Sequence, residues 1–104
     1  MNKNFLALIF VFLIFTISLT QNALAGSATI SWNANTESDL SGYKIYYGTS
    51  PRSGACPTGN YPNVIDVGNV TTYTFNNLTD GSTYYFSVTA YDTSNNESTC
   101  SAEV

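Results

Sequence analysis

The chain has 104 residues, a net charge of −4, an aromatic content of 14% and no histidine. A chain of this length holds one domain, and its acidic charge disfavours binding to nucleic acid or to anionic membranes. The absence of histidine excludes a serine–histidine catalytic triad and a histidine-ligated metal site.

The first 25 residues have the layout of a secretory signal peptide. Lys3 precedes an apolar run from Phe5 to Leu19, and small alanines lead up to an expected cleavage after Ala25. Cleavage would leave residues 26–104 as the only domain. The alternative is an uncleaved membrane anchor, but the apolar run is shorter than the ~20 residues that a spanning helix needs.

The mature chain is therefore expected to be secreted or extracytoplasmic, in the periplasm, on the cell surface or in the medium, with no membrane insertion after cleavage. Removing residues 1–25 takes away Lys3 and leaves two basic and seven acidic side chains, a net charge of −5. This charge strengthens the argument against nucleic acid as a partner.

From residue 26 onward, apolar and polar residues alternate, as is typical of half-buried antiparallel strands. Strands are expected at 28–32, 43–47, 63–67, 72–75 and 84–90, with a short last strand near the C-terminus. The segments between them are rich in Gly, Pro, Asn, Asp and Ser, which favour turns. Short strands separated by such loops predict an all-β sandwich.

The loop after the first mature strand has an alternation similar to a calcium-binding EF-hand loop, with Asn33, Asn35, Glu37 and Asp39. Its sixth position is Ser38 where glycine is needed, and its twelfth is Lys44 where glutamate is needed, so the motif fails. The alternative left open is a weak site shared with a later loop, through Asp92, Asn95 and Glu97. Over a calcium site we favour the interpretation that these acidic loops are simply solvated. We predict no metal, no cofactor and no catalytic residues.

Three stretches resemble the fibronectin type III domain. Residues 28–32 (ATISW) are similar to its strand B, and residues 42–48 (GYKIYYG) are similar to its strand C. Residues 78–90 (LTDGSTYYFSVTA) resemble its E–F turn and strand F, and they are the most specific of the three. The resemblance extends in detail to copies of this domain in exported bacterial proteins.

This resemblance implies an immunoglobulin-like antiparallel β-sandwich in which Trp32 is the central core residue. It also implies that Tyr84 forms the tyrosine corner, whose hydroxyl bonds to backbone near the preceding turn. The family's strand A has no counterpart between Ala25 and residue 28, so we expect a sandwich that lacks strand A. Strand 28–32 would then be an edge open to self-association. The alternatives are a domain trimmed to a minimum and a fragment of a longer reading frame.

Cys56 and Cys100 are the only cysteines. An even number of cysteines in an exported chain favours a disulfide, which here would close a long loop and add about 3 to 4.5 kcal/mol in the chain-entropy model. The alternative is that Cys100 occupies an apolar core position while Cys56 pairs with another molecule or stays free.

Four tyrosines form the expected ligand face. Tyr46, Tyr85 and Tyr91 point outward from their strands, and Tyr61 lies in the long loop beside them. With strands paired as in the family, Tyr46 faces Ser87 and lies diagonally from Tyr85. Exposed aromatic rings beside hydroxyls are suited to stacking on a carbohydrate or anchoring a protein.

We therefore predict a noncatalytic extracytoplasmic binding module whose partner is a protein or a carbohydrate. One alternative is that the tyrosines are simply good strand formers. Another is that the chain is a structural spacer or a fragment of a larger exported multidomain protein.

Overall fold

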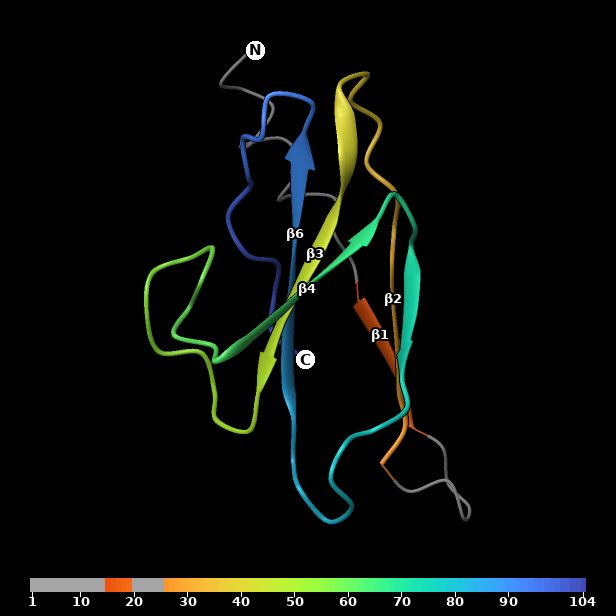
Figure 1. The fold of residues 1–104 in the computed structure, drawn as a ribbon, viewed down its shortest axis with the longest axis vertical. Coiled ribbons are helices and arrows are strands. Elements are labelled where there is room, and N and C mark those ends of the chain that lie inside the picture. Colours follow the sequence, from red (N-terminus) through yellow and green to blue (C-terminus); the bar gives the residue numbers. More distant parts are fainter. Residues whose placement is uncertain (1–14, 20–25) are drawn as a thin grey trace.

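The computed structural model describes the backbone of residues 15–19 and all atoms of residues 26–104. These residues form two three-stranded antiparallel sheets, with strand orders β1-β2-β5 and β4-β3-β6 (Figure 1). They include no helix, and hence none that could cross a membrane. The strands are β1 (Phe15–Leu19), β2 (Ala28–Trp32), β3 (Leu40–Gly48), β4 (Asn63–Gly68), β5 (Thr72–Phe75) and β6 (Tyr85–Asp92).

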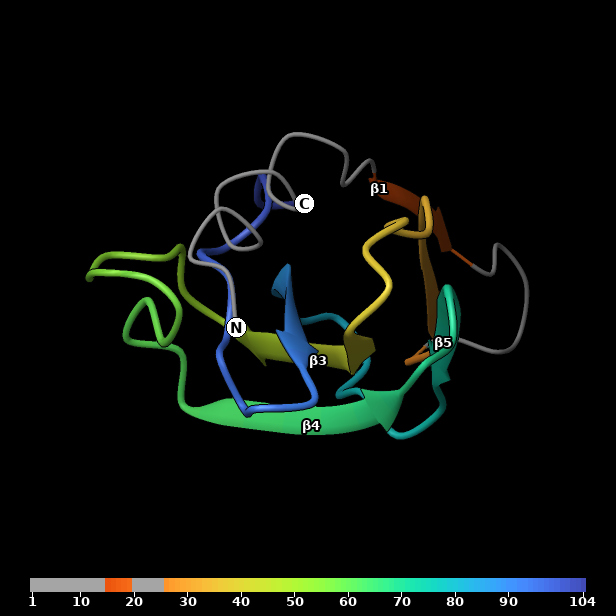
Figure 2. The same cartoon turned by 90° about the horizontal axis from the view of Figure 1, so that it is seen from above.

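The two sheets form the two layers of a sandwich, which confirms the predicted fold class (Figure 2). Strand β2 has the predicted bounds, whereas β3 begins three residues earlier than expected because its pairing with β6 continues through a bulge near Leu40. The predicted register is also confirmed, since Tyr46 is opposite Ser87. Apart from β1, the predicted leader lies outside the described residues.

The core lies between the sheets and consists of the apolar residues that alternate along each strand. Ile30 and Ile45 are completely buried, and Trp32 is 5% exposed. The indole of Trp32 meets the ring of Tyr43 edge-on, with centroids 5.4 Å apart. Aromatic rings supply much of the buried area, as a domain with few core residues requires.

The full chain does not lack a first strand, contrary to expectation. Residues Phe15–Leu19 pair antiparallel with Ala28–Trp32 over five residues, from Phe15 opposite Trp32 to Leu19 opposite Ala28. Strand β2 otherwise leaves a row of backbone donors and acceptors unpaired, and Phe, Thr and Ile are strong strand formers. The apolar run that predicts a leader thus also fits an edge strand.

The tyrosine corner predicted at Tyr84 is present. The hydroxyl of Tyr84 accepts a hydrogen bond from the backbone N–H of Thr79, at 2.8 Å. Gly81 lies in the turn between them with a φ of +83°, a conformation that glycine adopts without strain. This contact fixes the path of the chain into β6.

The expected last strand is replaced by an irregular segment, residues 98–104, which covers the outer edge of β6. Ser98 and Ser101 each donate a backbone N–H to β6, at the carbonyls of Ala90 and Val88. Their side-chain hydroxyls accept the N–H groups of the same two β6 residues, both at 2.9 Å. Two serine hydroxyls thus take the place of backbone carbonyls. The segment therefore contacts β6 at every third residue, whereas a regular strand would do so at every second.

Replacing Ser101 by alanine should destabilise the domain by about 1 to 3 kcal/mol, because it leaves the buried N–H of Val88 without its acceptor. The midpoint of urea unfolding measures this loss. Thr99→Ala is the matched control, since Thr99 is exposed and its side chain makes no hydrogen bond to the described residues. Equal midpoints for Ser101→Ala and the wild-type chain would contradict the role given to the hydroxyl.

Candidate functional site

The outer face of the β4-β3-β6 sheet, which carries the predicted ligand tyrosines, is largely closed by the protein itself. Tyr46 is only 7% exposed, and Ser87 and Thr89 are completely buried. The long loop of residues 49–62 and residues near the C-terminus contact this face. Consequently β6 is buried on both sides rather than on one.

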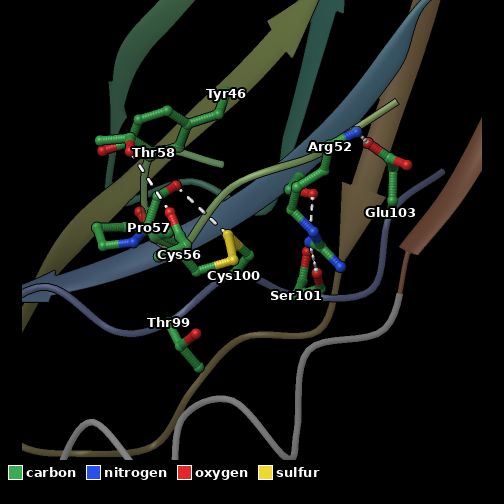
Figure 3. Close-up of a disulfide and its surroundings, with 12 residues drawn as sticks. Tyr46, Arg52, Cys56, Pro57, Thr58, Thr99, Cys100, Ser101 and Glu103 are labelled. Atoms are coloured by element: carbon green, nitrogen blue, oxygen red, sulfur yellow. Dashed lines mark hydrogen bonds between the residues drawn. A yellow bond between two sulfur atoms is a disulfide. The ribbon is translucent and has the colours of Figure 1, made fainter. Parts of the chain in front are cut away.

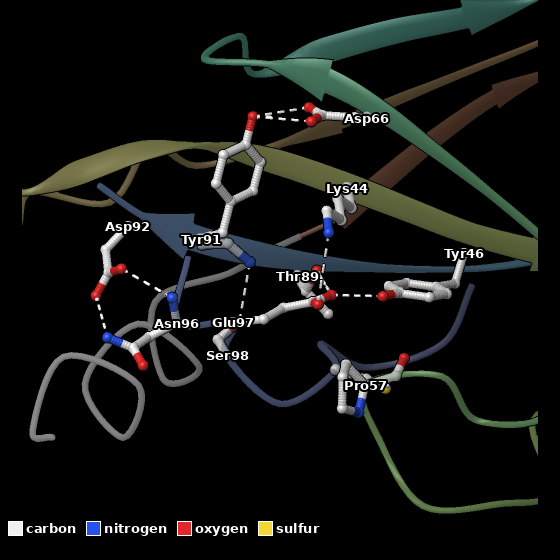
Figure 4. A network of polar contacts seen from close by, with 12 residues as sticks. Lys44, Tyr46, Pro57, Asp66, Thr89, Tyr91, Asp92, Asn96, Glu97 and Ser98 are labelled. Atoms are coloured by element: carbon white, nitrogen blue, oxygen red, sulfur yellow. Dashed lines mark hydrogen bonds and ion pairs between the residues drawn. The ribbon is translucent and has the colours of Figure 1, made fainter. Parts of the chain in front are cut away.

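Glu97 organises one half of this face (Figure 4). One carboxylate oxygen accepts the hydroxyls of Tyr46 at 2.6 Å and Thr89 at 2.7 Å. The other oxygen lies 3.7 Å from the Lys44 ammonium, which is also 5.6 Å from the centroid of the Tyr91 ring. Burial and the hydrogen bond to Glu97 both raise the pKa of Tyr46.

A second cluster joins the long loop to the C-terminal segment. Arg52 donates to the hydroxyl of Ser87 at 3.0 Å and, through its backbone N–H, to the carboxylate of Glu103 at 2.7 Å. The hydroxyl of Tyr61 donates a hydrogen bond to the carboxylate of Glu103 and lies 2.8 Å from the hydroxyl of Ser87. These contacts close a ring of four residues, Arg52, Ser87, Tyr61 and Glu103. Burial is the main cause that raises the pKa of Tyr61 to about 12.

Tyr91 reaches across β3 to bond Asp66 on β4, at 2.8 and 3.1 Å to the two carboxylate oxygens. Its ring passes over Gly42, where an added Cβ would lie 2.6 Å from the tyrosine hydroxyl. A glycine at this position therefore makes room for the contact. The hydrogen bond to Asp66 raises the pKa of Tyr91.

The predicted disulfide is present between Cys56 and Cys100, whose Cα atoms are 5.4 Å apart (Figure 3). Cys100 is 2% exposed, whereas Cys56 is half-buried in the long loop. Beside the bridge, Arg52 also donates to the backbone carbonyl of Ser101 at 2.8 Å. The bridge and the Arg52 contacts together attach the long loop to the segment that covers β6.

The structure thus places the four predicted ligand tyrosines on one connected face, but it engages three of their hydroxyls internally. Tyr46, Tyr61 and Tyr91 each bond a carboxylate, as described above. Tyr85 is half-buried, and its hydroxyl makes no hydrogen bond within the described part of the chain. A ligand role for these tyrosines stays a prediction, and the internal bonds would compete with it.

The raised pKa of Tyr61 predicts a loss of stability in alkali. Below pH 10 the hydroxyl of Tyr61 keeps its proton in both the folded and the unfolded chain, so its contribution to the free energy of unfolding is fully present. Between pH 10 and about 12 the unfolded chain loses that proton first, and the free energy of unfolding falls. Urea titrations across this range should show a smaller decline for Tyr61→Phe than for the wild type, and identical declines would contradict the prediction.

Asp92, one of the residues in the weak calcium alternative, is used inside its own loop. One carboxylate oxygen accepts the backbone N–H groups of Ser94 at 2.8 Å and Asn96 at 2.9 Å, and the other accepts the Asn96 side-chain amide at 3.1 Å. Burial raises the pKa of Asp92, but these hydrogen bonds outweigh burial and hold it below its usual value. The carboxylate therefore acts as a loop cap.

No cluster of three or more histidine, cysteine or acidic side chains suited to a metal is found among the residues that the structure describes.

In the loop after β2, the backbone N–H of Asn35 donates to the hydroxyl of Tyr43 at 2.8 Å. The buried side-chain amide of Asn35 and one carboxylate oxygen of Glu37 have no hydrogen-bond partner among the residues that the structure describes.

Sequence reasoning missed a groove of about 360 Å³ between β4 and β5, at the edges of these strands that pair with no other strand in residues 15–19 and 26–104. We call it the edge groove. It is lined by Tyr47, Asn63, Ile65, Tyr73, Thr74, Phe75, Asn76, Asn77, Leu78 and Tyr84. The only sequence signal for it is the asparagine pair that follows β5, which reads equally well as an ordinary turn.

Comparison with known proteins finds a family model and a relative that match this chain in sequence. The family model described as fibronectin type III domain matches residues 15–104. A Kelch domain-containing protein of Saccharolobus solfataricus is 42% identical over 66 residues, which are 64% of this chain and 8% of that protein. The chain thus spans a small fraction of the curated relative it matches.

Two solved structures show the same fold. The FN1-FN3 domains of chicken CNTN1 superpose with a TM-score of 0.68 and 18% identity, covering 86% of this chain and 28% of that chain. An Fn3-like protein from Clostridium thermocellum gives a TM-score of 0.62 and 23% identity, covering 88% of both chains. At these identities the likeness concerns the fold.

Proposed function

The chain belongs to the fibronectin type III family, and on that premise we propose that it is a noncatalytic binding module that works outside the cytoplasm. Domains of this family are typically modules without catalytic activity. Function on such a scaffold lies in the surface of the individual member, so the surface features of this chain carry the proposal.

The Cys56–Cys100 bridge is the observation that carries the extracytoplasmic part. Disulfides persist in oxidising compartments and are rare in the cytoplasm of most organisms. The predicted signal peptide supports the same compartment independently, because it is read from residues 1–25 alone. A bridged loop also keeps the surface preorganised, which lowers the entropic cost of binding.

Expression of the full chain with its leader in a bacterium tests the proposal. The intact mass of the protein from the periplasm or medium should equal residues 26–104 less the two thiol hydrogens. A full-length product in the cytoplasm with free thiols would contradict it. The exported protein is then screened against glycans and surface proteins, and specific binding to any of them supports a binding module.

A structural spacer is the second candidate, favoured by the small share of the Kelch domain-containing protein that the chain spans, 8% of its length. A coding frame that continues past Val104 into further domains, together with no binding in the screen, would favour the spacer. A specific ligand would favour the module.

Export would also change the outer edge of β2. Cleavage after Ala25 would remove β1 together with the leader and leave this edge unpaired. We keep the proposal that this edge pairs with a second copy, because unpaired strand edges template such contacts. Sedimentation of the exported protein should then show a concentration-dependent dimer, and a monomer at all concentrations would rule it out.

A further inference from the structure

We propose that the edge groove binds an uncharged oligosaccharide. This inference rests on the proposed function, because it names a ligand class and a surface for the binding module. It also moves the ligand from the predicted tyrosine face to the opposite side of the β4-β3-β6 sheet.

The first argument is the aromatic lining. Tyr47, Tyr73 and Tyr84 are half-buried at the groove, and Phe75 is 7% exposed behind them. The ring of Phe75 lies 4.9 Å from that of Tyr73 and 4.8 Å from that of Tyr47, so the rings support one another. The C–H face of a sugar ring carries slight positive charge and stacks on the negative face of such rings.

The second argument is the set of unused polar groups. The hydroxyls of Tyr47 and Tyr73, and the side-chain amides of Asn76 and Asn77, make no hydrogen bond to any described residue. The side-chain amide of Asn63 donates to the carbonyl of Tyr47 at 3.3 Å, and its own oxygen accepts no hydrogen bond from the described part of the chain. Hydroxyls and amides both donate and accept, as sugar hydroxyls do.

The third argument is charge. No acidic or basic residue lines the groove, although the chain has seven acidic side chains elsewhere. A polyanionic ligand would meet the negative field of the protein with no cation to hold it. A cationic ligand would find no carboxylate. The lining therefore favours a neutral ligand with many hydroxyls.

An extended peptide is the competing occupant, because the groove lies between two strand edges that no other described strand pairs with. A peptide that adds to a strand edge bonds mainly to its backbone, so it depends little on the side chains of Asn76 and Asn77. The unused side-chain amides and hydroxyls favour the saccharide.

Calorimetric titration of the exported protein tests the inference. Cellohexaose, xylohexaose and mannohexaose are the neutral probes, and oligogalacturonate of the same length is the anionic one. We expect at least one neutral probe to bind and the anionic probe to bind more weakly. The double variant Asn76→Ala/Asn77→Ala should weaken binding about tenfold or more. The variant Tyr73→Phe should also weaken binding, because it removes the hydroxyl and keeps the aromatic ring.

Asn33→Ala is the matched control, since this exposed amide lies in the loop after β2, outside the groove lining. It should leave affinity unchanged, and thermal unfolding should show that every variant is folded. Unchanged affinity in the Asn76/Asn77 variant, a preference for oligogalacturonate, or binding only of extended peptides would each overturn the saccharide site. If proteins bind and no oligosaccharide does, the edge-groove inference fails and the binding module stands. If nothing binds, both fail.

Discussion

Reduction of the Cys56–Cys100 bridge is expected to lower the free energy of unfolding by about 4 kcal/mol. The bridge closes a loop with a sequence separation of 44, and the chain-entropy model assigns that loss to the greater freedom of the unfolded chain. A domain of this size has only about 5 to 10 kcal/mol of stability, so the loss is a large share.

Urea unfolding of the oxidised protein, with and without a thiol reductant, measures this effect. The double variant Cys56→Ala/Cys100→Ala is the control, because the reductant should not change its unfolding midpoint. It also shows whether the contacts of Arg52 with Ser87 and Glu103 hold the long loop without the bridge. Equal midpoints for the oxidised and reduced wild-type protein would contradict the stabilising role of the bridge.

Phe86→Ala is expected to cost about 3 to 5 kcal/mol, the range for truncating a buried aromatic residue. Phe86 is 2% exposed and belongs to a cluster of aromatic rings in the core. Its centroid lies 5.2 Å from that of Phe75, 6.0 Å from Tyr47 and 6.3 Å from Tyr84. Its loss opens a cavity between the sheets that these rings cannot fill without leaving their positions.

Fluorescence of Trp32 during urea unfolding reports this change, because Trp32 is the only tryptophan and lies in the core. Phe86→Leu is the matched variant, since it keeps most of the buried apolar area and should cost less than the alanine variant. A Phe86→Ala protein that unfolds at the wild-type urea concentration would show that the core does not depend on this ring.

The strands and the core could be predicted from the sequence because they depend on alternation. Ile30 and Trp32 face inward from β2, whose burial alternates with a period of two, and Phe86 and Val88 of β6 lie in the same core. The Tyr84 corner and the cysteine pairing were also predictable, the first from a specific motif and the second from the number of cysteines. These features depend on local pattern or on simple counting.

The missed features depend on contacts between distant residues. Strand β1 pairs with β2 at the start of the family match, although its residues read as part of a leader. The closing of the outer face requires Glu97 and Glu103 to meet Tyr46 and Tyr61, residues that lie 51 and 42 positions away in the sequence. The alternation of β6 could not show that a loop covers its polar side.

The edge groove was missed for the same reason. Its aromatic residues were assigned to the core from their alternation, and the asparagines after β5 were assigned to a turn. Both assignments are correct locally. The groove arises only where the edges of β4 and β5 remain apart, which is a property of how the two sheets pack.

An amide chemical-shift map of the exported protein, titrated with the neutral oligosaccharide that binds most tightly, tests most directly where the proposed binding module holds its ligand. The largest shifts are expected at residues 73–78 and at Tyr84, with Tyr46, Tyr61 and Glu97 unchanged. Shifts confined to Tyr46, Tyr61, Tyr85 and Glu97 would place the ligand on the outer face of the β4-β3-β6 sheet and contradict the edge-groove site.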